Sequence, residues 1–321
     1  MYGDNNGHIV LSSCPLTQIS TSISSTSISR SSIMTVTLLL IDPQKDFHPG
    51  GSLAIPTADQ DAERIATLIR KHGSKIDRIV ATMDSHLKLH IAHPGFWLAP
   101  DKKTHPDPFT LISSQDIVNG TWHPRPNLKL SADLLDSSVF VRDDLVDQAT
   151  GSIDLLKYCI EYTKRLEEKG RFQLCIWPEH CLIGSPGHAV VDVVREALDE
   201  WSETTGGSIE WFHKGQNLLT EMYSALEAEI PVSKSNTFNK ELQMLLLASD
   251  QLLVCGQAMS HCVNYTLRDI VSRWPKEETS KICLLTDCAS AVPGFEAAAD
   301  TFQKDMEEVG VVLHTVSQVF L

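Results

Sequence analysis

The stretch Val36-Thr37-Leu38-Leu39-Leu40-Ile41-Asp42 decides the fold class. Its apolar residues run without alternation and end at an aspartate, which is typical of a parallel strand covered on both faces. Parallel strands must be joined by crossovers of a dozen or more residues, so we expect helices between them. Six further strand-like runs follow, at residues 78–83, 172–176, 208–212, 252–255, 282–286 and 311–316.

Helical patterns fill the intervals between these runs. In residues 59–71, Ala62, Ile65, Ala66 and Ile69 recur with the 3.6-residue period of one helix face. Strands that alternate with helices predict right-handed βαβ crossovers and an open parallel sheet with helices on both faces, an α/β fold. Ligands of such sheets bind beyond the carboxyl ends of the strands. The same helical pattern occurs at residues 153–168, 189–201, 238–247, 262–274 and 295–309.

Two segments depart from this alternation. Residues 1–34 contain ten serines and three threonines, and we expect a disordered tail or a translation start at Met34 rather than an organelle-targeting peptide. Residues 98–150 are rich in Pro, Asp, His and Lys, and we expect an insertion that covers the carboxyl edge of the sheet. Residues 35–321 are then expected to form a single domain.

Composition excludes several classes of function. The chain has 41 acidic and 27 basic side chains, a formal charge of −14, so binding to nucleic acid is not expected. No apolar run approaches the roughly 20 residues that a membrane helix needs. The 8 cysteines are scattered and form no CxxC pair, which favours free thiols in a reducing compartment and a cytoplasmic protein. The oligomeric state stays open, with a homo-oligomer as one option.

Three side chains that follow predicted strands could form a nucleophilic centre. Cys262 begins a predicted helix, whose N-terminal N–H groups favour a thiolate and could hold an oxyanion. Asp42 could take the thiol proton, and Lys214 could pair with that carboxylate. The structural alternatives are an inert buried cysteine, a turn aspartate and a solvated lysine, with Lys234 as a rival for Lys214.

A second group could bind a metal. Asp84 and His86 lie in one short turn, His90 follows four residues later, and His180 comes from another strand-like run. Carboxylate and imidazole ligands with an open position suit a catalytic Zn²⁺, with Fe²⁺ or Mn²⁺ as alternatives. The structural alternative is a loop of surface histidines, and His93, which precedes a proline, fits that alternative best.

These motifs together resemble those of the nicotinamidases (pyrazinamidases) in the isochorismatase-like cysteine hydrolase superfamily. The stretch Leu40-Ile41-Asp42-Pro43-Gln44-Lys45-Asp46-Phe47-His48-Pro49-Gly50-Gly51-Ser52-Leu53 is similar to their D-x-Q-x-D-F-x-P-G-G-x-L opening. The likeness continues in order over residues 36–316. It includes Asp84-Ser85-His86, Trp177-Pro178-Glu179-His180-Cys181, His213-Lys214-Gly215 and Cys255-Gly256-Gln257-Ala258-Met259-Ser260-His261-Cys262.

The resemblance implies a three-layer α/β/α fold with a six-stranded parallel sheet, so one of the seven runs would lie outside it. It implies a catalytic triad of Asp42, Lys214 and Cys262. A cis peptide would join Gln257 to Ala258, and the N–H groups of Ala258 and Cys262 would hold an oxyanion. The implied ligands of a divalent metal are Asp84, His86 and His180, with His90 as a fourth ligand or an outer group. The implied substrate contacts are Phe47, Trp177 and Gln257.

The implied activity is the metal-dependent hydrolysis of a small carboxamide, nicotinamide, to nicotinate and ammonia through a Cys262 thioester, in NAD salvage. The chain departs from the family pattern at Ser85, where an aromatic residue is frequent, at Gln257 and at Met259-Ser260. These departures fall on the pocket, so two alternatives stay open. One is a metal-free isochorismatase-like hydrolase of another small amide or a vinyl ether, and the other is a catalytically silent binding protein.

Overall fold

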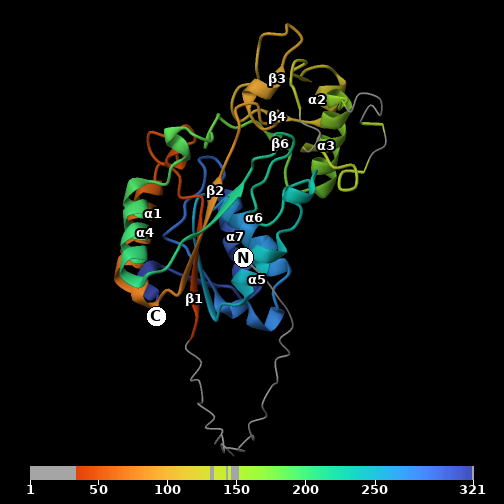
Figure 1. The fold of residues 1–321 in the computed structure, drawn as a ribbon. Coiled ribbons are helices and arrows are strands. Elements are labelled where there is room, and N and C mark those ends of the chain that lie inside the picture. The colour runs from red at the N-terminus through yellow and green to blue at the C-terminus, as the bar shows by residue number, and fades with distance from the viewer. Residues whose placement is uncertain (1–33, 131–133, 142–143, 146–151, 320–321) are drawn as a thin grey trace, which may run out of the picture. The chain divides into compact units, whose positions relative to one another are not determined.

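The computed structural model describes residues 34–130, 134–141, 144–145 and 152–319, and a central sheet of six parallel strands organises them (Figure 1). This sheet and the helices that flank it confirm the predicted α/β fold. In spatial order the strands are β10 (Val312–His314), β9 (Ile282–Leu285), β8 (Gln251–Gly256), β1 (Val36–Ile41), β2 (Arg78–Asp84) and β7 (Glu210–Lys214).

Strand β1 lies between β8 and β2, and all of its residues are buried. Leu39 and Ile41 belong to one hydrophobic core, and Leu38 and Leu40 belong to a second core on the opposite face. Because each face of the sheet is covered, both side-chain sets of the strand must be apolar. This double burial is the physical reason for the unbroken apolar run that predicted the strand.

Helices cover each face. The core that contains Leu38 and Leu40 is closed by α1 (Ala58–His72) and α4 (Asp192–Thr205), which pack against each other. The opposite core receives apolar side chains from several helices, and three of them follow β7 in the chain. These are α5 (Lys240–Leu247), α6 (Cys262–Ser272) and α7 (Glu296–Glu308).

The run 172–176 is the one that lies outside the central sheet. Its strand, β6 (Leu174–Cys175), pairs antiparallel with β4 (Leu111–Ile112) of the predicted insertion. A second short pair joins β3 (Trp97–Leu98) to β5 (His123–Pro124), and α2 (Ser114–Val118) packs on α3 (Leu155–Lys169). These elements lie beyond the end of β2 in Figure 1. Their action as a cover remains a prediction.

In the part of the chain that the structure describes, no helix has the length and apolarity needed to cross a membrane. The expected tail at residues 1–34 falls outside the described residues except for Met34.

Glu229 connects the segment after β7 to the end of α3. Its side chain is 1 % exposed. The Lys169 ammonium donates to the Glu229 carbonyl at 2.6 Å, and the Arg171 guanidinium lies 3.8 Å from the carboxyl group. Burial raises the pKa of Glu229 to about 7, so the folded protein retains this proton at pH values where an unfolded chain releases it.

We predict that Glu229→Gln weakens the pH dependence of stability. A raised folded-state pKa stabilises the protein below the unfolded value, and that contribution is lost as the pH rises through about 7. Between pH 5 and pH 8 the parent should lose up to about 3 kcal/mol more unfolding free energy than Glu229→Gln. Urea unfolding at both pH values measures this, with the exposed Glu241→Gln as control; equal losses in Glu229→Gln and the parent would contradict the assignment.

Candidate active site

A buried ammonium lies where three strands end. Lys214, the last residue of β7, is 3 % exposed. Its Nζ is 2.9 Å from Asp42 Oδ2, 3.2 Å from Asp84 Oδ1 and 3.4 Å from Cys262 Sγ. The structure therefore brings the three residues of the expected nucleophilic centre together. Lys234, the rival of Lys214, is exposed at the surface.

Asp42 is held by β2 on one side and by the ammonium on the other. Its N–H donates to Thr82 O at 3.2 Å, and its Oδ1 accepts a hydrogen bond of 2.6 Å from the Thr82 hydroxyl. Its φ of 44° is in the left-handed region, which few residues other than glycine adopt. The turn that follows β1 thus directs this carboxylate back over the strand ends.

Burial and mutual contact shift the pKa values of all three residues of this centre. Burial raises the pKa of the Cys262 thiol well above its usual value, and the Lys214 ammonium only partly opposes this rise. Burial also raises the pKa of Asp42, despite Lys214. Burial alone would lower the pKa of Lys214, but Asp42 and Asp84 hold it well above its usual value.

The turn before α6 has the expected cis peptide between Gln257 and Ala258. The Ala258 carbonyl accepts hydrogen bonds from His261 N at 3.0 Å and Val263 N at 3.1 Å, the residues on either side of Cys262. Both Ala258 and Cys262 line one cavity. The expected oxyanion donors therefore belong to residues that border the same space as the thiol.

Gln257 does not contact that space. Its Nε2 donates to Asp61 Oδ2 at 2.8 Å, and its Oε1 accepts from Ser290 N at 3.3 Å. The expectation of a substrate contact at Gln257 is corrected accordingly, because both ends of its amide are used to hold the turn.

The cavity has aromatic walls. Phe47 and Trp177, both expected there, line it together with Tyr223, His261 and Glu221. The Trp177 indole donates to the Tyr223 hydroxyl at 3.0 Å, and its ring meets the His261 ring edge-on at 5.0 Å. Sequence analysis missed the last three residues. His261 had a signal, because it directly precedes Cys262, whereas Tyr223 and Glu221 follow no strand and have none.

Three acceptor atoms converge beside the ammonium. Asp84 Oδ2 is 3.1 Å from His86 Nε2 and 3.4 Å from His180 Nε2. The Nδ1 atoms of the two rings donate to Gly215 O at 3.1 Å and Pro178 O at 2.8 Å. In their neutral forms the two rings would present Nε2 lone pairs to a carboxylate oxygen, an arrangement that needs a cation between them or added protons. Two imidazoles and a carboxylate fit a divalent metal such as Zn²⁺.

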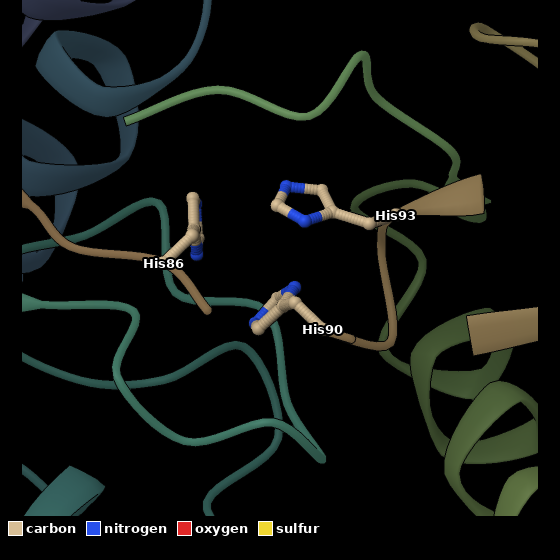
Figure 2. A group of neighbouring side chains, drawn as sticks. All are labelled: His86, His90 and His93. Atoms are coloured by element: carbon tan, nitrogen blue, oxygen red, sulfur yellow. The ribbon is translucent and has the colours of Figure 1, made fainter. Parts of the chain in front are cut away.

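His90 lies beside this group but has no free lone pair. The rings of His90, His86 and His93 face a common space in Figure 2. Its Nδ1 accepts from Ala92 N at 3.2 Å, so its Nε2 carries the proton that is donated to Thr220 O at 2.9 Å. Of the two expectations for His90, these bonds favour the outer position.

The prediction that His93 belongs to a surface loop is wrong, because the side chain is completely buried. Its ring centre is 5.1 Å from that of His86 and 5.5 Å from that of His180. Its Nδ1 faces Lys88 O at 3.4 Å, and its Nε2 has no hydrogen-bond partner in the described part of the chain. His93 therefore supplies the additional imidazole lone pair that His90 lacks.

Comparisons with known proteins find chains that are similar in sequence and in fold. The nicotinamidase of Escherichia coli K12 is 21 % identical over 283 residues, which cover 87 % of this chain and 94 % of that protein. A nicotinamidase/pyrazinamidase structure from Acinetobacter baumanii has a TM-score of 0.56 at 18 % identity and covers 89 % of this chain and 99 % of the other.

A structure of a yeast nicotinamidase bound to the inhibitor nicotinaldehyde also has a TM-score of 0.56 at 18 % identity, with 88 % and 100 % covered. No protein-family model matches the chain. The likenesses confirm the predicted fold and the predicted resemblance to nicotinamidases.

We predict that Gly215→Ala impairs cation binding. Gly215 has φ +77°, and a Cβ there would lie 2.7 Å from His86 Cε1 and 2.8 Å from Asp84 Oδ1. Gly170→Ala is the matched control, since Gly170 has φ +70° and open space around it. Each substitution should cost about 1 kcal/mol of stability through its backbone. Calorimetric titration of the metal-free proteins with Zn²⁺ should show weakened binding only in Gly215→Ala; equal affinities in the two variants would contradict the assignment of Asp84 and His86.

Proposed function

We propose that this chain is a nicotinamidase-type amidohydrolase that converts nicotinamide to nicotinate and ammonia. The observation that carries the proposal is the contact of a buried ammonium, Lys214, with the Cys262 thiol at 3.4 Å and the Asp42 carboxylate at 2.9 Å beside an aromatic-walled cavity. The nicotinamidases to which the chain is similar support this substrate class.

The first step is proton transfer from Cys262 to Asp42. The raised pKa of Asp42, caused by burial, makes it a stronger base than an exposed carboxylate. The Lys214 ammonium contacts both Asp42 Oδ2 and Cys262 Sγ, so its positive charge stabilises whichever of the two is negative. During the proton transfer the negative charge moves from Asp42 to Cys262, and it stays in contact with the same ammonium throughout.

The thiolate then attacks the carboxamide carbon and forms a tetrahedral oxyanion. The N–H groups of Ala258 and Cys262 would stabilise this oxygen, a contribution often worth about 3 kcal/mol per donor. Protonated Asp42 returns its proton to the nitrogen as the C–N bond breaks, so ammonia leaves and a thioester remains on Cys262. Water, with Asp42 again as base, hydrolyses the thioester to the acid and restores the thiol.

Phe47 and Trp177 would hold the substrate's ring between aromatic walls. The nicotinate produced would enter NAD salvage. The seven cysteines of the described residues are all buried and free, which supports a reducing, cytoplasmic setting.

Asp84, His86 and His180 would hold a divalent cation, with Zn²⁺ favoured by this donor set and Fe²⁺ or Mn²⁺ as alternatives. His93 is available as a further ligand. When bound, such a cation supplies Lewis acidity and an attachment point for a ring nitrogen at the cavity wall. The protein's own part is to fix both ligand rings through their Nδ1 hydrogen bonds and to exclude bulk water.

We predict that Cys262→Ala abolishes ammonia release from nicotinamide. Loss of the nucleophile should lower the rate at least about a thousandfold, because neither Asp42 nor Lys214 can form the acyl bond. Cys283→Ala, which removes a buried thiol from β9, is the control and should retain activity. A coupled ammonia assay, together with thermal unfolding of both variants, makes the test. An active Cys262→Ala enzyme would overturn the nucleophile assignment.

Removal of metal should remove activity. Dialysis against a strong chelator is expected to strip the cation from Asp84, His86 and His180, and ammonia release should fall in proportion to the metal content measured on the same sample. Addition of Zn²⁺, Fe²⁺ or Mn²⁺ should restore it and identify the most effective ion. Full activity in verified metal-free protein would favour the metal-free isochorismatase-like alternative, and a panel of small amides and vinyl ethers would then be assayed.

A further inference from the structure

Ser85 lies between two of the proposed metal ligands and is completely buried. Its hydroxyl donates to Met83 O at 3.1 Å. The same oxygen is 2.9 Å from His188 Nε2 and 3.0 Å from His213 Nδ1. A hydroxyl has one proton to donate and two lone pairs. Because its proton is directed to Met83, both histidines must present N–H groups to it, and its bonding capacity is completely used.

The two histidines come from different parts of the chain. His213 belongs to β7 and directly precedes Lys214, whereas His188 ends a 3₁₀ turn a few residues after His180. Their rings are nearly parallel, 14° apart, with centres separated by 6.2 Å. One oxygen thus joins the ends of β2 and β7 and the loop that carries His180.

Main-chain hydrogen bonds also connect Ser85 and its neighbour His86 to β7 and to the loop that carries His180. Ser85 N donates to Lys214 O at 2.9 Å, and His86 N donates to Cys181 O at 3.0 Å. The Gln44 amide adds a bridge on the other side, since its Nε2 donates to Asp84 O at 2.7 Å and to His188 O at 3.1 Å. The main-chain bonds set the path of the Asp84–His86 turn, and the Ser85 hydroxyl adds side-chain hydrogen bonds to both neighbouring segments, through His213 and His188.

We infer that Ser85 is a positioning residue of the metal site, acting with His188 and His213. The inference rests on the proposed function, because it takes Asp84, His86 and His180 as the ligands. These three residues belong to two separate segments, and the angle between Asp84 and His180 depends on how those segments are tied together. The Ser85 hydroxyl ties them through His188, and it ties both to the strand that ends in Lys214.

Loss of the Ser85 hydroxyl is expected to change the geometry of the proposed metal ligands. Without the hydroxyl, the turn keeps its main-chain bonds but loses its side-chain bridge to His188, in the segment that follows His180. Residues that orient metal ligands typically change metal affinity by about 10- to 100-fold when they are removed. Ser85 contacts neither substrate nor metal in this scheme and acts only through its neighbours.

The test compares Ser85→Ala with Ser85→Thr, which keeps the hydroxyl, and with Ser249→Ala. Ser249 is a buried serine that donates to the Thr37 hydroxyl at 2.7 Å near the amino end of β1, away from the site. The Zn²⁺ dissociation constant of each metal-free protein is measured by competition with a chromogenic chelator. Urea unfolding of each metal-free protein is recorded in parallel.

Ser85→Ala should bind Zn²⁺ at least tenfold more weakly than the parent. Ser85→Thr should recover most of that affinity, and Ser249→Ala should bind as the parent does while losing comparable stability. His213→Ala should reproduce part of the Ser85→Ala loss and add little to it in the double variant. If the parent binds Zn²⁺ and Ser85→Ala binds it as tightly, the inference about Ser85 is overturned, while the proposed metal-dependent function is not contradicted. A parent that binds no divalent cation contradicts the metal-dependent function, and this inference with it.

Discussion

The buried Lys214 ammonium is the constraint on which the site depends. An unpaired charge at 3 % exposure would cost several kcal/mol, so the fold must bring partners to it. Asp42 follows β1, Asp84 ends β2 and Lys214 ends β7, three strands that are neighbours in the sheet, and Asp84 is directly opposite Lys214 in register. A shift of either strand pair by one residue would separate the charges. Strand register and the geometry of the proposed catalytic site are therefore fixed by the same contacts.

The two carboxylates on this ammonium have different chemistry because their second partners differ. Burial alone would raise the pKa of Asp84, but His86 and Lys214 hold it well below its usual value. Besides Lys214, Asp42 meets the neutral Thr82 hydroxyl and the Cys262 thiol, and burial raises its pKa. The pKa of Asp84 is therefore lowered, which suits the proposed ligand of a cation, and that of Asp42 is raised, which suits the proposed proton acceptor. Lys214 therefore contacts both carboxylates, although their pKa values are shifted in opposite directions.

What the sequence predicted, and what it did not, follows from the range of the interactions involved. Helices and strands were found because their apolar periodicity is local, and Asp42, Lys214 and Cys262 because each follows a strand. The run 172–176 has the same local pattern as the sheet strands, and only its pairing with β4 excludes it from the sheet. The burial of His93 and the turning of Gln257 towards Asp61 depend on packing between distant segments, which no local pattern reports.

The cavity wall belongs to a different part of the structure from the charges. Trp177 N donates to Ala92 O at 2.8 Å, and the preceding Ile176 exchanges main-chain bonds with residues 109 and 110 of the insertion. The Phe109 ring also meets the Trp177 ring edge-on at 5.8 Å. The position of this aromatic wall is thus set by segments outside the central sheet. Changes in the insertion can reshape the space around a substrate while Asp42, Lys214 and Cys262 stay fixed by the sheet, so reactivity and substrate choice are separable in this fold.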